Sequence, residues 1–247
     1  MTTVLFVHGF PFDHLMWRHQ IAALTRWHCL APDLRGAGAA VTSLAVADYS
    51  MAAYADDLIA LLDRSQVRQA VVCGLSMGGY IAFELLRRFP ERVLATILCN
   101  TKAEADTADG KRGRDALAAR VQRGGATAAA AELVPKLLAP ATRERRPDVV
   151  REVQTMIDRQ PVAGIVGALH ALRERPDSTP LLAQINVPVL VLAGADDQIA
   201  PVGGMEAMAK AIPGAEFAVI REAGHLSPLE QPREVNAAVV TFLEELR

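Results

Sequence analysis

Short apolar runs alternate with amphipathic helical patterns along most of this chain. Six runs lack a polar face, which predicts strands buried on both sides: Thr3–Val7, His28–Ala31, Ala70–Cys73, Ala95–Cys99, Pro188–Ala193 and Ala215–Ile220. Helical patterns follow these runs at Leu15–Arg26, Met51–Arg64, Met77–Phe89, Val202–Ile212 and Pro232–Leu246. Strands and helices in alternation, with short links, predict a doubly wound α/β fold with a mostly parallel sheet of about six strands.

The alternation stops between residues 100 and 179, where no convincing strand occurs. Helical patterns fill this segment near Arg112–Arg123, Thr127–Leu138, Pro147–Arg159 and Val162–Arg173. Because an all-helical block cannot join the sheet, we expect it to sit over the carboxyl ends of the strands as a lid. The prediction is a core of residues 1–99 and 180–247 with a helical lid of residues 100–179.

Composition narrows the classes of function. A chain of 247 residues suits one large α/β domain, and a net charge of −2 gives no sign of binding to nucleic acid or an anionic membrane. No apolar run approaches the roughly 20 residues of a membrane helix. The first run is short and has no basic residue before it, which favours a strand over a secretion signal. Three cysteines without pairable spacing favour a cytoplasmic protein with reduced thiols: Cys29, Cys73 and Cys99.

The stretch from Gly74 to Gly78 is a G-x-S-x-G pattern centred on Ser76. Chance alone produces such a pattern in about one chain in ten of this length. Here it follows a predicted strand and opens a predicted helix, as a nucleophile elbow requires. The two glycines remove side chains that would collide in so sharp a turn. The alternative is a glycine-rich turn with an idle serine.

A serine nucleophile needs a base, and the base needs an orienting acid. His225 follows the last predicted strand and Asp197 follows the preceding one, so both are expected at the same sheet edge as Ser76. The order Ser, Asp, His is that of a hydrolase built on this kind of sheet. Asp197 could instead cap a helix before Pro201, and Asp196 competes for the role of the acid. His225 could be a capping or core histidine.

The sequence His8-Gly9-Phe10-Pro11 follows the first strand. An acyl-transfer site needs two backbone N–H donors where negative charge develops on the substrate oxygen. Met77, directly after the serine, supplies one, and Phe10 is the candidate for the other because Pro11 has no N–H. His8 is expected to brace the loop. A simple turn at the strand end is the alternative.

Together these segments resemble the α/β-hydrolase family over nearly the whole chain outside the helical segment. The resemblance rests on the HGFP loop at residue 8, the triad positions, Pro32-Asp33-Leu34-Arg35-Gly36, and the histidine loop from Gly224 to Pro232. In this family the acid follows its strand as G-x-x-D, which supports Asp197. Within it, the chain resembles small carboxylesterases, 3-oxoadipate enol-lactonases and cofactor-free haloperoxidases (perhydrolases).

One departure concerns the sheet. Members of this family usually have two strands before the HG loop, whereas here that loop begins at residue 8. The expected sheet therefore lacks these strands and exposes an edge, which would favour either dimerisation or a less stable sheet. The oligomeric state stays open between monomer and homodimer.

Five residues are predicted to line a substrate pocket: Phe10, Met77, Leu137, Met156 and His170. The alternative is core packing for Leu137 and Met156, and a place at a helix interface for His170. Three other histidines show no metal-ligand spacing and are expected to be structural: His14, His19 and His28. No metal or other cofactor is predicted.

The resemblance and the predicted triad imply hydrolysis of small carboxylic esters with short, medium or aryl groups. Two alternatives use the same triad: opening of an enol-lactone, and formation of a peracid from an ester or acid with peroxide. A third alternative is a ligand-binding receptor with little or no turnover.

Overall fold

The computed structural model describes residues 1–40 and 44–246. Within them a single sheet of six parallel strands has the order β2-β1-β3-β4-β5-β6. The strands are β1 (Thr3–Val7), β2 (His28–Leu30), β3 (Ala70–Leu75), β4 (Val93–Cys99), β5 (Val189–Gly194) and β6 (Glu216–Ile220). The predicted α/β fold with a mostly parallel sheet of about six strands is confirmed.

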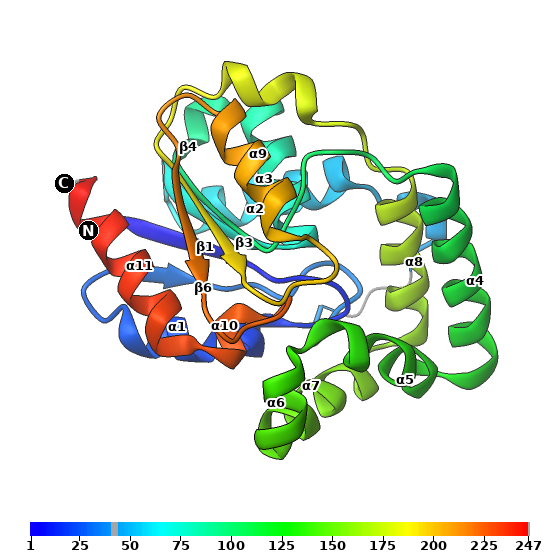
Figure 1. The fold of residues 1–247 in the computed structure, drawn as a ribbon. Coiled ribbons are helices and arrows are strands. Elements are labelled where there is room, and N and C mark those ends of the chain that lie inside the picture. Colours follow the sequence, from blue (N-terminus) through cyan, green and yellow to red (C-terminus); the bar gives the residue numbers. More distant parts are fainter. Residues whose placement is uncertain (41–43, 247) are drawn as a thin grey trace.

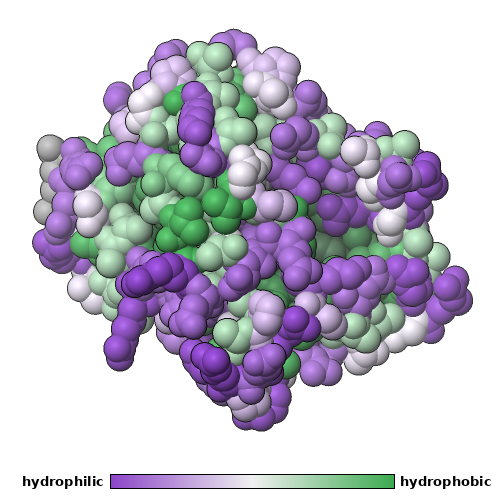
Figure 2. Space-filling model, viewed as in Figure 1, coloured by the Kyte–Doolittle hydropathy of each residue, from purple (hydrophilic) through white to green (hydrophobic). Residues whose placement is uncertain are grey.

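Burial separates the central strands from the edge strands. Every residue of β1, β3 and β5 is buried, and β4 exposes only Leu94. At the two edges, His28 of β2 and Val219 of β6 are exposed, and a hydrophobic patch lies over the β6 edge in Figure 2. The prediction that every strand is buried on both faces is therefore wrong for β2 and β6. An edge strand has a neighbouring strand on one side only, so its other side stays open.

Helices cover both faces of the sheet (Figure 1). The short α1 (Arg18–Ala23) packs against α11 (Pro232–Glu245) on one face, beside α10 (Ser227–Glu230). On the other face lie α2 (Met51–Arg64), α3 (Met77–Arg88) and α9 (Val202–Ala211). The described residues also include four 3-10 helices: η1 (His14–Trp17), η2 (Val46–Asp48), η3 (Pro90–Arg92) and η4 (Thr179–Gln184).

The first predicted helix, Leu15–Arg26, is shorter than expected. The side chain of Asp13 accepts a hydrogen bond from the Leu15 N–H at 3.0 Å, which starts the tighter η1 turn instead of an α-helix. After α1 the Trp27 N–H bonds to the Leu24 carbonyl at 3.1 Å and turns the chain into β2. The Asp13 cap thus shortens the predicted helix at its N-terminal end, and the turn at Trp27 shortens it at its C-terminal end.

Between β4 and η4 the chain forms five α-helices, which we call the helical insert: α4 (Ala108–Gly124), α5 (Ala126–Leu137), α6 (Pro140–Arg145), α7 (Pro147–Asp158) and α8 (Val162–Arg173). It lies to one side of the sheet in Figure 1. The sequence predicted four of these helices within a few residues. The six-residue α6 was missed because it spans less than two turns and carries no hydrophobic repeat.

Candidate active site

The loops that follow β1, β3, β5 and β6 carry the predicted site residues. Since all strands are parallel, these loops all leave from the carboxyl ends of the strands. In the sheet, β1 and β3 are neighbours. From β1 the chain passes to β2 on one side, and β3 lies on the other. Ligands in open α/β sheets bind at such a switch point, beyond the carboxyl ends of the strands.

Ser76 occupies a sharp turn between β3 and α3, with φ 52° and ψ −110°. Few residues other than glycine adopt such a positive φ, so the backbone is strained here. A side chain on Gly74 would collide with the Gly78 carbonyl, and one on Gly78 would collide with the Val7 carbonyl. The glycines of the G-x-S-x-G pattern are therefore required by close backbone packing around Ser76.

The loop after β1 lies directly beside this turn. A Cβ atom on Gly9 would lie 3.6 Å from the Cβ of Ser76. The Gly9 N–H donates to Met16 Sδ at 3.3 Å, and the Phe12 N–H donates to the Gly9 carbonyl at 3.0 Å. Pro11 has no N–H, so Phe10 carries the remaining backbone donor of this short loop.

His8 links this loop to the turn that begins with Pro32. The Leu34 N–H donates to His8 Nε2 at 2.9 Å, so the ring proton resides on Nδ1, which lies 3.0 Å from the Gly9 carbonyl. Burial lowers the pKa of His8, in keeping with a neutral ring. Both ring nitrogens of His8 thus have partners within the two loops, so His8 braces the loop and does not act as the base for Ser76.

His225 and Asp197 form a buried pair. Nδ1 of His225 lies 2.8 Å from Oδ2 of Asp197, and Oδ1 accepts hydrogen bonds from the N–H groups of Ile199 and Ala200 at 2.8 and 3.0 Å. Burial alone would raise the pKa of the Asp197 carboxyl, but the His225 imidazole and the accepted hydrogen bonds hold it below its ordinary value. Asp196, the competing acid, is exposed.

Two further polar side chains, absent from the sequence prediction, complete this pair. Asn100 Nδ2 donates to Asp197 Oδ2 at 2.9 Å and to the Gly224 carbonyl at 3.1 Å, and Ser227 Oγ donates to Asn100 Oδ1 at 2.6 Å. One signal was available for Asn100, because it directly follows the apolar β4 at the same sheet edge.

Tyr80, with its phenol hydroxyl, is buried in α3, four residues after Ser76. Burial raises the pKa of Tyr80, which keeps this hydroxyl protonated. The guanidinium of Arg175 lies 4.4 Å from the centre of the Tyr80 ring and 2.6 Å from Asp106. These contacts hold the ring of Tyr80 in place, and no pattern in the residues predicted them.

A mostly apolar pocket opens beside the Gly9 loop, and Phe10 and Met77 are among its lining residues, whereas Ser76 and His225 are not. The other three predicted pocket residues, Leu137, Met156 and His170, are not among its lining residues. The face of α8 that borders the pocket carries Gly164, Ile165 and Ala168 instead. Leu137 still meets the site through its backbone, because its carbonyl accepts the His225 N–H at 2.9 Å.

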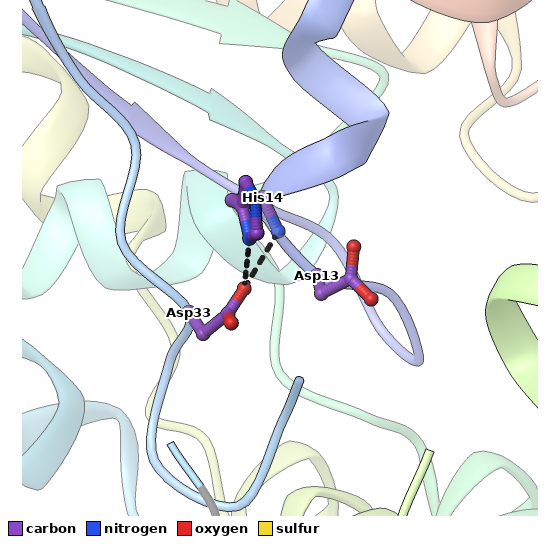
Figure 3. A group of neighbouring side chains, drawn as sticks. All are labelled: Asp13, His14 and Asp33. Atoms are coloured by element: carbon purple, nitrogen blue, oxygen red, sulfur yellow. Dashed lines mark hydrogen bonds and ion pairs between the residues drawn. The ribbon is translucent and has the colours of Figure 1, made fainter. Parts of the chain in front are cut away.

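One group of potential metal ligands lies near this loop: Asp13, His14 and Asp33 each offer an atom within 4.8 Å of the others (Figure 3). Asp33 Oδ1 accepts the backbone N–H and lies 2.7 Å from Nδ1 of His14, and Oδ2 accepts the Ala39 N–H at 2.7 Å. Asp13 binds the guanidinium of Arg159. A cation would have to displace these partners, so the group is better explained as a brace between loops.

Among residues 1–40 and 44–246, no helix combines the length and the apolar character needed to cross a bilayer.

Comparison with known proteins gives the family. A family model described as alpha/beta hydrolase fold matches residues 2–232. A thermophilic esterase from Thermogutta terrifontis, solved with malate bound, superposes with a TM-score of 0.94 at 40% identity, over 100% of this chain and 90% of that one. The 3-oxoadipate enol-lactonase 2 of Acinetobacter baylyi is 34% identical over 93% of this chain and 84% of its own. The enol-lactonase of Burkholderia xenovorans is 27% identical, with a TM-score of 0.91 over 98% and 91% of the two chains. This chain is therefore a member of the alpha/beta hydrolase fold family, and it is a hydrolase.

Proposed function

We propose that this hydrolase is a carboxylesterase that cleaves small carboxylic esters through an acyl-enzyme on Ser76. The observation that carries the proposal is the buried His225–Asp197 pair at the sheet edge where Ser76 sits in its strained turn. Nucleophile, base and orienting acid are the three parts that such chemistry needs.

In the proposed reaction, Ser76 Oγ attacks the ester carbonyl carbon while Nε2 of His225 takes the serine proton. Nε2 is the available ring nitrogen because Nδ1 faces Asp197. The tetrahedral intermediate collapses, the C–O bond to the alcohol breaks, and His225 returns the proton to the leaving oxygen. Water then attacks the acyl group by the same route, which releases the acid and restores Ser76.

The backbone N–H groups of Phe10 and Met77 are the proposed oxyanion donors. Met77 is the first residue of α3, so its N–H has no acceptor within that helix and lies at the helix's positive end. Phe10 is adjacent to Gly9, the residue that packs against Ser76. Acyl transfer by these groups requires no metal or organic cofactor.

The helical insert is proposed to serve as a lid, because Gly164, Ile165 and Ala168 of α8 close one side of the pocket. A pocket bounded by these small and medium side chains together with Phe10 and Met77 favours short acyl or aryl groups over long chains. Cytoplasmic location and the choice between monomer and homodimer stay predictions from the sequence.

The charge of the pocket favours a neutral ester over an anionic lactone. Arg35 contributes the one guanidinium among the described lining residues. Its Nε and Nη2 bind Asp57 at 2.6 and 2.7 Å, and its Nη1 binds the Asp48 carbonyl at 2.8 Å. The enol-lactone of a dicarboxylic acid retains a carboxylate, and Arg35 is already neutralised by its own partner.

A panel of p-nitrophenyl esters, run on wild type beside Ser76→Ala, tests the proposal. We expect hydrolysis of acetate and butyrate esters, weaker activity on long chains, and discrimination against an ester with a terminal carboxylate. Wild type should be labelled stoichiometrically by a fluorophosphonate, and Ser76→Ala should not.

The alternatives give different outcomes in the same panel. Faster turnover of an enol-lactone, as the names of two relatives suggest, or of acetate with peroxide would reassign the reaction on the same triad. A preference for long chains with activation at an interface would overturn the small-ester assignment. No labelling and no turnover of any substrate would leave a ligand-binding protein.

A further inference from the structure

Asn100 is a fully buried amide at the carboxyl end of β4 that takes no part in the steps above. Its φ is 46°, in the left-handed region that asparagine tolerates better than most residues. Its N–H donates to the Leu192 carbonyl of β5 at 2.9 Å. The backbone therefore fixes where this side chain leaves the sheet, between the serine turn and the loop of Asp197.

The amide contacts Asp197 and the residue that precedes His225. Nδ2 donates to Asp197 Oδ2 at 2.9 Å, the same oxygen that lies 2.8 Å from His225 Nδ1. It also donates to the carbonyl of Gly224, directly before His225, at 3.1 Å. One side chain thus joins the acid to the loop that carries the base.

Ser227 fixes which way the amide faces. An amide turned by 180° would place Oδ1 against Asp197 Oδ2, with two acceptors opposed. The hydroxyl of Ser227 donates to Asn100 Oδ1 at 2.6 Å and is itself fully buried. This bond favours the orientation in which Nδ2 points at the carboxylate.

We propose that Asn100, held by Ser227, is a positioning residue that sets the orientation and charge of the Asp197–His225 pair. The inference rests on the proposed function, because Asn100 acts only through His225. Two donors share Asp197 Oδ2, and the amide withdraws part of its negative charge. Without the amide, His225 loses an orienting contact and its protonated form gains stabilisation from the carboxylate.

Several other titratable side chains lie on the elements around this network. Glu230 accepts the Gly224 N–H at 2.8 Å from the far side of the histidine loop. The remaining ones, on or beside the loops after β3, β4 and β5, are Tyr80, Cys99, Lys102, Asp106 and Asp196. They are the same in all variants below, so a changed pH profile reports on Asn100.

The test compares Asn100→Asp and Ser227→Ala with wild type in ester hydrolysis between pH 5 and 9. Asn100→Asp keeps the shape of the side chain but replaces the donor with an acceptor. We expect kcat to fall by about 10- to 100-fold, the scale of one lost hydrogen bond to a charged group. The acid limb of kcat/KM should move up by about one pH unit, since a negative charge is added beside the pair. KM should be unchanged because Asn100 does not line the pocket.

Ser227→Ala should shift kcat and the acid limb of kcat/KM in the same directions as Asn100→Asp, by smaller amounts. If Asn100→Asp fails to fold, Ser227→Ala alone tests the positioning role. Asn186→Asp, at an exposed position before β5, adds the same charge elsewhere and should behave as wild type. The low-field NMR resonance of the His225 Nδ1 proton should move in both network variants and stay in the control.

Fluorophosphonate labelling separates the two possible failures. Wild type that neither labels nor turns over overturns the proposed function, and the positioning role with it. Wild type that labels, beside folded network variants with unchanged kcat, pH profile and proton resonance, overturns the role of Asn100 alone.

Discussion

Arg159, directly after α7 of the helical insert, holds the Asp13 carboxylate with two nitrogens: Nε lies 2.8 Å from Oδ2 and Nη2 lies 2.7 Å from Oδ1. Gln160 adds an Nε2 donor to Oδ2 at 2.9 Å. Asp13 is buried and follows Phe10 by three residues, so these contacts tie the insert to the proposed oxyanion loop.

Replacing Arg159 by Ala should therefore affect both stability and catalysis. The buried carboxylate of Asp13 would keep Gln160 but lose its cation. Because the Arg159 side chain is 40% exposed, water replaces part of the contact, and we expect the free energy of unfolding to fall by about 1–2 kcal/mol. A looser oxyanion loop should lower kcat/KM by about tenfold.

Urea unfolding and ester kinetics measure the two effects. Arg151→Ala, at an exposed position of α7, is the matched control and should change neither quantity. Equal behaviour of the two variants would show that the Asp13–Arg159 contact does not hold the loop.

Gly164 brings α8 against the turn at Gly36. A Cβ on Gly164 would collide with the Gly36 carbonyl, and its nearest neighbours are all backbone atoms, which yield little. Gly164→Ala should force α8 away from this turn and lower the free energy of unfolding by about 1–3 kcal/mol. Since α8 lines the pocket, the preferred acyl chain should lengthen.

Gly113 in α4 provides the contrast, because a Cβ there would meet no atom within 4 Å. Gly113→Ala should raise the free energy of unfolding by up to about 1 kcal/mol through better helix propensity. Thermal or urea unfolding of both variants checks the pair, and destabilisation of similar size in both would contradict the close approach of α8.

The fold followed from the sequence because its signals are local. Apolar runs such as Val4–Val7 predict strands, and the G-x-S-x-G pattern around Ser76 predicts the elbow. Both predictions use only neighbouring residues. The parallel sheet then brings the ends of β5 and β6 to one edge, which placed His225 near Asp197 in the prediction. The structure pairs Asp197 with His225 and leaves Asp196 exposed, a distinction that the sequence alone supported only by resemblance.

The pocket and the polar network depend instead on how separate elements meet. Which face of α8 borders the pocket is set by the contact of Gly164 with Gly36, so His170 could not be excluded from the pattern of one helix. The bridge from Ser227 through Asn100 to Asp197 joins three loops. Neither relation has a signature in residue spacing.

Substitutions of Ser76 should abolish activity, and their effect on stability should depend on whether the new residue has a Cβ. Ser76→Ala and Ser76→Gly both remove the nucleophile, and both should lower kcat by at least about 10³-fold and abolish labelling. The positive φ of 52° strains any residue with a Cβ, so the glycine variant should be more stable than the alanine variant by about 1 kcal/mol. Urea unfolding of the two variants gives the difference.

Ser65→Ala, at the end of α2, is a control for loss of a hydroxyl and should keep full activity. Retention of esterase activity by Ser76→Ala would remove Ser76 from the reaction. An alanine variant at least as stable as the glycine variant would show that the turn stores no strain.

His8 should make stability depend on pH. In the fold its Nε2 accepts the Leu34 N–H, and burial lowers its pKa, whereas in the unfolded chain the ring binds a proton near pH 6.5. As the pH falls below about 6.5, the unfolded state therefore binds more protons than the folded state, and the free energy of unfolding decreases. Above that pH the contribution is fully present.

Urea unfolding between pH 5 and 8 measures this slope in wild type and in His8→Asn, which cannot titrate. The variant should be less stable at pH 8, because the buried Leu34 N–H loses its acceptor, and its stability should depend less on pH. The pKa of His19 is also lowered, first by burial, so His19→Asn is the matched control and shows how much of the slope belongs to that ring. A slope in His8→Asn as steep as in wild type would mean that His8 is not the group that carries the acid sensitivity of the fold.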